Sequence, residues 1–468
     1  MLPRFEVVAR RRPVDLVCPG SVVLDQPLTA GGRTPTPHPA PYAAVVADLD
    51  PGPFDGRLEL ELVSGDVRLA GWYDGSGALG LTVTAGGRTS IHRSRRHGRV
   101  PHPAAGVGLT LTGTHLTVLS RDESPDRSPG RDPDPDRGPV GWTVRGRVDL
   151  RDRVDTRDEA WLAALTTGHR WVGSGAPPGG RLRAGGFGQL GLRDVRVVTA
   201  ADGSPYRDDG RLLLTATSAG PGFFDTAHTS VWALDTDSLD VEHRADLFFR
   251  RPGRPGVFGD HATHLVRDGD RWLVATSTWG DFDPGRPDAT VAVTLAVTDA
   301  DLLTGRHVLD TRPLALPTGD LRSVGVWDPH LVRERDRWLV GFVSARRFFR
   351  FHPALAEGPS LDALALRAAD PGRIATEGTT LLRLDGDWRV LASDGRDGRR
   401  GQRRGYPVLD LDLTPVGALD APYLTNIPWP TLVPADDGGW LMVTFDGTPY
   451  GGPLPGYGTH GDLVLLRT

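Results

Sequence analysis

The sequence WDPHLVRERDRWLVGFVSA at residues 327–345 joins a short apolar run to a nine-residue one through a polar turn. DHATHLVRDGDRWLVATSTW at 260–279 repeats this order. Both nine-residue runs mix β-branched, aromatic and leucine residues and carry small residues towards their ends, as buried strands do. The intervening ERD and RDGD are typical of tight turns. Each segment therefore predicts one antiparallel hairpin.

The same hairpin occurs five times in the second half of the chain. Its nine-residue strands lie at 211–219, 271–279, 337–345, 387–395 and 439–447. Four of the five carry tryptophan at the second position. A hairpin repeated every 40–70 residues or so is typical of a β-propeller with one copy per blade. We expect an all-β fold with a five-bladed β-propeller at 187–468; the alternative is a β-sandwich in which the tryptophans coincide by chance.

The first part of the chain has a different pattern. Residues 1–180 hold many short alternating runs between glycine-rich turns, which predicts an antiparallel β-sandwich. Within it, 121–139 is dense in proline and charge and is expected to be a disordered loop. The glycine-rich stretch 173–186 is expected to link the two domains.

Bulk properties narrow the possible partners and location. The 468 residues carry a net charge of −5 with mixed signs, so no basic surface indicates nucleic-acid binding. No run reaches the roughly 18–20 apolar residues of a membrane helix, and no export signal is visible. We expect a cytoplasmic protein, although a secreted protein lacking its signal would look the same. The single cysteine, Cys18, excludes an internal disulfide framework.

Acidic residues recur at the start of the predicted inner strands. Aligning the five hairpins places there Asp194, the pair Asp260–His261, Asp328, Glu377 and the pair Pro428–Trp429. Inner strands of a propeller surround one axis, so these positions should converge at one mouth. Clustered carboxylates repel one another, which favours a functional role. The alternative is that each acid is an ordinary turn residue.

Three motifs resemble the family 43 glycoside hydrolases and related five-bladed furanosidases. They are RDVRVV at 193–198, WDPHLV at 327–332 and EGTTLLRLDGDWRVLASDG at 377–395, and the resemblance covers 190–468. It implies that Asp194 is the general base, Glu377 the general acid and Asp328 a group that tunes the acid and orients the sugar. Such a protein would hydrolyse a furanoside, of the arabinofuranosidase or arabinanase type, with inversion and without a required cofactor.

Sugar binding calls for aromatic platforms and polar side chains around the carboxylates. Tryptophans outside the repeated strand position are expected at the rim, with buried core as the alternative. The candidate substrate-binding residues are Arg193, His261, Trp279, Trp327, Arg396 and Trp429. His460 resembles a late histidine that the family places near an axial metal ion such as calcium, although a lone histidine is more often a plain hydrogen-bonding residue. The expected partner is an oligo- or polysaccharide.

Two other functions fit a propeller. A retaining fructan-type enzyme would use the same three acids with the first as nucleophile, but RDVRVV lacks the Asn-Asp-Pro-Asn-Gly type of opening. A non-catalytic carbohydrate-binding propeller would repeat the same ligand residues in every blade. Here the residues differ between blades, which favours one asymmetric central site.

Overall fold

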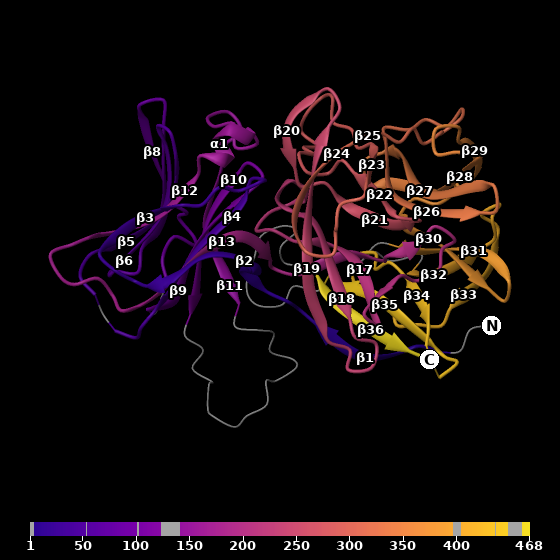
Figure 1. Ribbon diagram of the computed structural model, residues 1–468, viewed down its shortest axis with the longest axis horizontal. Coiled ribbons are helices and arrows are strands. Elements are labelled where there is room, and N and C mark those ends of the chain that lie inside the picture. The colour runs from indigo at the N-terminus through magenta and orange to yellow at the C-terminus, as the bar shows by residue number, and fades with distance from the viewer. Residues whose placement is uncertain are drawn as a thin grey trace.

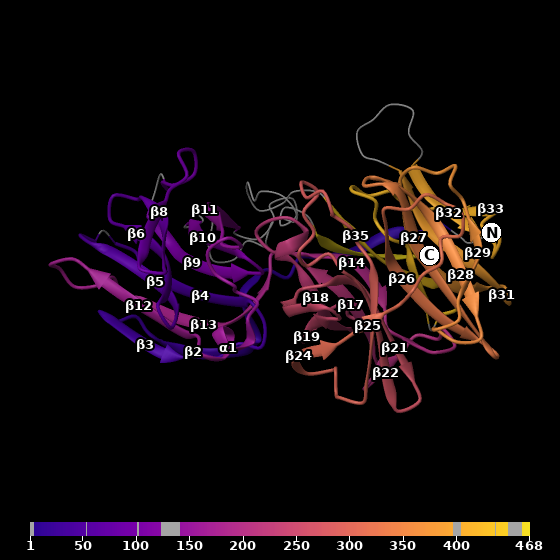
Figure 2. The ribbon, with the colours of Figure 1, turned by 90° about the horizontal axis from the view of Figure 1, so that it is seen from above.

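The chain folds almost entirely into β-strands, which form two bodies side by side (Figures 1 and 2). The computed structural model describes residues 4–52, 54–100, 103–122, 141–395, 404–435, 437–447 and 461–468. Helix within these ranges is confined to α1 (Glu159–Ala163) and one 3-10 turn, Phe224–Thr226. None of the described helices is long and apolar enough to cross a membrane. The loop expected at 121–139 falls, from residue 123 onward, outside the described residues.

The first body consists of two six-stranded sheets. One has the order β11 (Trp142–Asp149), β10 (His115–Asp122), β9 (Ala104–Thr112), β4 (Tyr42–Leu49), β13 (Gly180–Gln189), β2 (Asp15–Pro27). The other has the order β3 (Gly31–Pro35), β12 (Thr166–Val172), β5 (Arg57–Ser64), β6 (Val67–Asp74), β7 (Leu79–Ala85), β8 (Arg88–His92). One cluster of buried residues joins them, with Val45 and Leu109 from the first sheet against Leu60 and Leu81 from the second.

The second body consists of five sheets in chain order. The first is β14 (Leu192–Val197), β17 (Arg211–Ser218), β18 (His228–Leu234), β19 (Val241–Arg251), β20 (Arg254–Phe258), with β16 (Arg207–Asp208) and β24 (Gly305–Asp310) beside it. The second is β15 (Thr199–Ala200), β21 (His261–Asp268), β22 (Arg271–Ser277), β23 (Val293–Thr298), β25 (Arg312–Pro313). The third is β26 (Gly325–Glu334), β27 (Arg337–Arg347), β28 (Arg350–Gly358), β29 (Ala365–Ala369). The fourth is β30 (Thr376–Leu384), β31 (Asp387–Gly395), β32 (Arg404–Leu409), β33 (Pro415–Leu419). The fifth is β34 (Thr431–Pro434), β35 (Trp440–Asp446), β36 (Asp462–Arg467), β1 (Glu6–Arg11).

Five buried clusters join these sheets pairwise into a closed ring. Trp272 packs between the first and second sheets, Trp338 between the second and third, and Trp388 between the third and fourth. Met442 lies between the fourth and fifth sheets. Leu441, its neighbour in sequence, packs on the opposite face between the fifth sheet and the first. The repeated strand of the sequence is thus buried on both faces, which explains its continuous apolar character.

Local sequence fixes the hairpins of the ring. In the β30–β31 turn, Asp385 and Gly386 both have positive φ, at 53° and 88°. A type I′ turn requires this conformation at its two central residues, and Asp-Gly is among the pairs that adopt it most readily. The register of Leu384 opposite Asp387 follows from that two-residue turn. The sequence DGD therefore sets which face of β31 is presented to each neighbouring sheet.

The observed first body differs from the predicted first domain, residues 1–180, at both of its ends. Strand β1 does not join the first body; it pairs antiparallel with β36 and becomes the outer strand of the fifth sheet. Residues 180–186, expected to be linker, belong to β13, which pairs with β2 and β4 inside the first body. The first body therefore spans about 15–189. Glycines in β13 misled the composition argument, because Gly185 sits where a side chain would strike the Ser21 backbone, 2.1 Å from its carbonyl oxygen.

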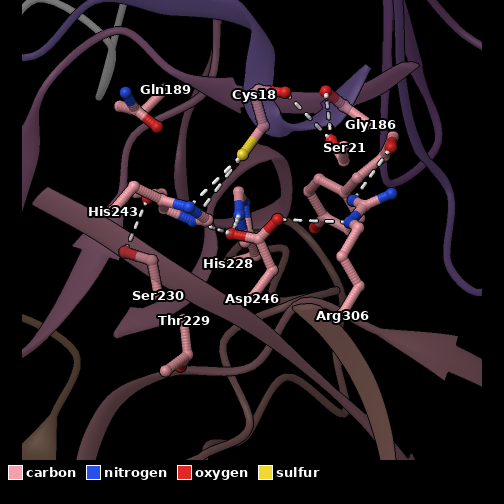
Figure 3. Close-up of polar contacts among 12 residues, drawn as sticks. Cys18, Ser21, Gly186, Gln189, His228, Thr229, Ser230, His243, Asp246 and Arg306 are labelled. Carbon is pink, nitrogen blue, oxygen red and sulfur yellow. Dashed lines mark hydrogen bonds and ion pairs between the residues drawn. The ribbon is translucent and has the colours of Figure 1, made fainter. Parts of the chain in front are cut away.

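A polar cluster lies where the two bodies meet (Figure 3). Cys18 of β2 lies 3.4 Å from Nδ1 of His243 on β19, and Nε2 of His243 lies 2.8 Å from Oδ1 of Asp246. Arg306 of β24 donates to Oδ2 of Asp246 (3.1 Å) and to the Tyr42 carbonyl oxygen. Burial opposes charge on His243, but its hydrogen bonds to Asp246 and Cys18 prevail and raise its pKa to about 10. The bodies are therefore joined through charged groups.

Candidate active site

Strands β14, β21, β26 and β30, one in each of the first four sheets, contain a register shift at an equivalent place. The shifts follow Arg193, His261, Trp327 and Glu377. The next residue in each case has a left-handed backbone; these residues are Asp194 (φ 49°), Ala262 (φ 59°), Asp328 (φ 57°) and Gly378 (φ 70°). Such bulges redirect side chains, and aspartate and glycine tolerate the left-handed region better than most residues. The same kind of backbone bulge thus occurs in four of the five sheets.

This register corrects the alignment of the acids made from sequence. Asp194 and Asp328 are equivalent, but the residue equivalent to them in the fourth sheet is Gly378, and Ala262 holds that place in the second. Glu377 stands one residue earlier, level with Trp327. Asp260 precedes Ala262, at the shift in β21, by two residues and is bonded to Arg251 and to the Gly280 amide. Aligning the repeats by sequence alone could not detect this one-residue offset, because it arises from a bulge in the backbone.

Hydrogen bonds between sheets hold the bulges in place. The Asp328 amide donates to Oγ of Ser277 in the second sheet (2.9 Å). The Ala262 amide donates to Oγ1 of Thr217 in the first sheet (3.3 Å). The Gly378 amide in turn donates to the Asp328 carboxyl. The starts of β21, β26 and β30 are therefore each tied to the sheet before, which holds Asp328 and Glu377 on fixed strands.

Glu377 holds its proton more tightly than an ordinary glutamate. Burial and the negative charge of Asp194 raise the pKa of Glu377 to about 8, while Arg193 and the Trp429 indole oppose that rise. Trp429 packs so closely on the adjacent Gly378 that a Cβ there would lie 2.3 Å from the indole Cγ. Near neutral pH, Glu377 is therefore a carboxylic acid able to donate a proton.

Asp328 belongs to the same charge cluster. Burial raises its pKa well above the ordinary value, and the charges of Glu377 and Asp194 add to this effect, whereas Arg196 opposes it. Oδ2 of Asp328 is buried and has no hydrogen-bond partner among the described residues. Because Asp328 and Glu377 repel each other, the pair cannot lose both protons easily, and at least one remains protonated near neutrality.

Arg196 is the site residue that sequence reasoning missed. Its fully buried guanidinium donates to the carbonyl oxygens of Asp328 (2.9 Å) and Thr379 (3.1 Å). It lies 4.6 Å from the centre of the Trp429 ring. Burial lowers its pKa to about 10, against the charges of Asp328 and Asp194, so it stays positive near neutrality. The signal was present in RDVRVV, where an arginine between two buried valines requires an acidic partner.

Two buried, neutral histidines lie farther along the inner strands, His264 on β21 and His330 on β26. The rings of His264 and His330 stack with centroids 4.0 Å apart. Burial lowers the pKa of both well below the usual value. Nδ1 of His264 accepts the Leu331 amide of the next sheet, and Nδ1 of His330 accepts the Leu381 amide. These histidines link neighbouring sheets and are not free for chemistry.

The three tryptophans expected at the rim lie in one aromatic cluster beside the acids. They are buried, with exposed fractions of 7% for Trp279, 3% for Trp327 and 2% for Trp429, and they belong to one buried cluster with Ala262. Trp279 and Trp327 are 5.2 Å apart between ring centres. Their burial fits the alternative of core tryptophans, and removing one of them should cost about 3–5 kcal/mol.

Two further candidates lie next to Asp194. The Arg193 guanidinium is 3.8 Å from Oδ1 of Asp194 and packs on the Phe445 ring. His261 is buried, and although burial lowers its pKa, the Asp194 charge is close enough to act against that shift. The remaining two candidates, Arg396 and His460, fall outside the described residues.

One group of described side chains has the spacing of metal ligands. The ligand atoms of Cys18, His243 and Asp246 lie within 4.8 Å of one another. However, His243 is protonated well above neutral pH, and both oxygens of Asp246 are already engaged, by two histidines and by Arg306. A protonated His243 imidazole and an Asp246 carboxylate whose two oxygens are both hydrogen-bonded suit a contact between the bodies better than a cation site.

No family model and no curated protein matches the chain. Solved structures that resemble it include a family 117 glycoside hydrolase of the marine bacterium Zobellia galactanivorans, 11% identical, covering 59% of this chain and 84% of that one, TM-score 0.42. An exo-1,5-α-L-arabinanase from a bovine ruminal metagenomic library is 10% identical and covers 59% and 92%, TM-score 0.37. A family 32 β-fructofuranosidase of Bombyx mori is 14% identical and covers 58% and 59%, TM-score 0.39.

Proposed function

We propose that the protein is a glycoside hydrolase that cleaves a furanoside, of the arabinofuranosidase or arabinanase type, with inversion at the anomeric carbon. The observation that carries this proposal is the convergence of three acids from three sheets, Asp194, Asp328 and Glu377, around Arg196. A binding scaffold gains nothing from carboxyls that raise one another's pKa. Glycosidic cleavage requires such a set.

Each acid then has a role. Glu377, protonated near neutrality, donates its proton to the leaving oxygen as an oxocarbenium-like transition state forms. Asp194, ion-paired with Arg193, accepts a proton from the attacking water. Asp328 shares charge with Glu377 and, through its buried Oδ2, is placed to orient a sugar hydroxyl. No step in this scheme uses a cofactor.

We also propose that the five ring sheets are the blades of a β-propeller and that the two six-stranded sheets form a β-sandwich. The closed series of inter-sheet clusters supports the first assignment, and the single core between the two sheets supports the second. In a propeller the bulged strand starts meet at one mouth of the ring, which is where a sugar would enter.

The proposal is tested by a substrate screen followed by product analysis. Nitrophenyl furanosides and pyranosides are assayed first, then arabinan and arabinogalactan. On the substrate that is cleaved, proton NMR of the first product formed should show the opposite anomeric configuration to the substrate. Retention would indicate instead that Asp194 acts as a nucleophile, as in a fructan-type enzyme. Absence of cleavage across the whole panel would contradict the proposal.

A further inference from the structure

A pocket of about 290 Å³ lies between the two bodies and contains no acid of the proposed active site. His115, Arg147 and Arg151 of the first body form one wall, and loops of the ring around Phe223, Phe282 and Phe349 form the other. Its volume is at the low end of the roughly 300–1,000 Å³ of ligand pockets, enough for a sugar unit or two.

The loops that form this pocket lie at the same end of the ring as the acids. The start of β14 pairs with the end of β17, so the following loop with Phe223 is level with Asp194. The start of β21 pairs likewise with the end of β22, ahead of Phe282. The start of β26 pairs with the end of β27, ahead of Phe349. The pocket therefore flanks the mouth of the ring.

A continuous row of aromatic rings leads from the pocket to the acids. Phe224, which lines the pocket, stacks on Trp279 with centroids 4.7 Å apart and an interplanar angle of 19°. Trp279 contacts Trp327, and Trp327 immediately precedes Asp328. A row of packed, largely buried aromatic side chains thus connects the pocket with the strand that carries Asp328.

The pocket presents the chemistry that a sugar ring needs. Phe223 and Phe349 expose 58% and 51% of their surface, unusual for phenylalanine, and offer flat apolar faces. Within the described chain, Arg147 contacts the Pro221 carbonyl oxygen and no carboxylate, so donors remain for hydroxyl groups. Arg151 is bonded to Asp225 and Asp283, which neutralises these acids and fixes the wall.

The first body is held firmly enough to serve as a wall. Tyr42 donates to the Ala227 carbonyl oxygen (2.7 Å), and Arg157 donates to that of Gly280 (2.9 Å). Both acceptors lie in the loops that carry the pocket phenylalanines. Gly113 approaches the Asp225 backbone so closely that a Cβ would lie 2.3 Å from its carbonyl oxygen. These contacts fix the wall against the mouth of the ring.

We propose that this pocket is a distal subsite that binds a sugar unit of a saccharide chain, at least one unit away from the bond that is cleaved. The first body is then part of the substrate cleft, and the enzyme prefers chains to single glycosides. This inference rests on the proposed glycosidase function and deepens it. The occupant is a saccharide because the exposed faces of Phe223 and Phe349 and the donors of Arg147 share one pocket at the end of the ring that carries the acids.

The test compares Phe223→Ala and Phe349→Ala with wild type and with Ile91→Ala. Ile91 is 67% exposed on the far strand of the first body, so it controls for loss of an exposed apolar side chain. Kinetics are measured on 4-nitrophenyl α-L-arabinofuranoside and on α-1,5-arabino-oligosaccharides of two to six units. The wild-type kcat/KM should rise with chain length. The two phenylalanine variants should lose about tenfold on the longest chain and less than twofold on the nitrophenyl glycoside.

A binding arm separates this inference from the proposed function. Wild type and variants are run in native gels containing debranched arabinan, xylan or inulin. Retardation of wild type and Ile91→Ala, lost in the phenylalanine variants, supports the subsite even if no substrate is cleaved. Cleavage with unchanged chain-length dependence in the variants overturns the subsite and leaves the hydrolase proposal standing. Neither retardation nor cleavage on any of the three polymers overturns both.

Discussion

At the scale of single residues, the site depends on buried charges that partly conflict. Three carboxyls share two arginines, and one of the three acids is held in the neutral form near pH 7. Such an arrangement costs folding free energy, which is expected where activity requires it. Two substitutions measure this cost.

Glu377→Gln should stabilise the protein at alkaline pH. The pKa of Glu377 is about 8 in the fold, above its ordinary 4.5, so stability falls as pH rises through that window. Glutamine carries no charge at any pH and lacks this loss. Urea unfolding should show the variant about 1–3 kcal/mol more stable than wild type at pH 8.5 and equal near pH 4.5. Glu242→Gln, an exposed acid, serves as control; a pH-independent difference for Glu377→Gln would contradict the assignment.

Arg196→Met should be severely destabilising. It leaves buried acids without their cation, which typically costs about 3–5 kcal/mol. The matched control is Arg211→Met, since Arg211 pairs with Glu242 at the surface and such pairs contribute at most about 1 kcal/mol. Chemical unfolding at pH 7 compares the two. Similar losses in both variants would mean that Arg196 does not neutralise the site.

At the scale of single elements, the bulge at the start of each inner strand positions the acids. Gly378 has φ of 70° and no room for a Cβ beside Trp429, whereas Gly386, in the turn that ends the same strand, has φ of 88° and open space around it. Alanine at either site pays backbone strain of about 1 kcal/mol, but only Gly378→Ala also displaces the indole.

Gly378→Ala should therefore destabilise the protein more than Gly386→Ala and should also reduce turnover, because Glu377 moves with the bulge. Thermal unfolding and kcat on the cleaved substrate are measured for both variants. Equal effects of the two substitutions would show that the close packing of Trp429 on Gly378 does not hold Glu377 in place.

Sequence reasoning found the elements but not their fine register. The five hairpins were predictable because each strand is buried on both faces and each turn has its own chemistry, as at Asp385–Gly386. The position of Asp194, Asp328 and Glu377 near the starts of inner strands was also predictable, whereas their roles stay predictions. The offset of Glu377 by one residue was not predictable, because the amino-acid sequence does not reveal the bulge. The place of strand β1 in the fifth sheet was not predictable either, because its pairing with β36 joins residues more than 450 positions apart.

At the scale of the whole molecule, the two bodies are joined by charge as well as by apolar contact. Tyr42 stacks on Phe248 with centroids 5.1 Å apart. His243 lies between Cys18 and Asp246 (Figure 3). The first body is therefore expected to unfold together with the ring and not as a detached module.

The contact between the bodies should weaken as pH rises. The pKa of His243 is about 10 in the fold, above its ordinary 6.5, so its contribution is complete below pH 6.5 and is lost as pH rises towards 10. His243→Gln should cost about 1–3 kcal/mol at pH 6 and little at pH 10. Unfolding at both pH values tests this, with the exposed His97→Gln as control. A loss of stability that is the same at both pH values would mean that the His243 imidazole is neutral in the fold.

The most direct test of the account is the leaving-group dependence of catalysis. The kcat/KM values of wild type, Asp194→Asn and Glu377→Gln are measured on two arabinofuranosides that differ only in the aglycone, nitrophenyl and methyl. A nitrophenolate leaves without protonation, so Glu377→Gln should retain most of its activity on that substrate and lose at least about 100-fold on the methyl glycoside. Asp194→Asn should lose activity on both substrates, because cleavage of either one needs the activated water. Equal loss on the two substrates by Glu377→Gln, or wild-type turnover by Asp194→Asn, would contradict the account.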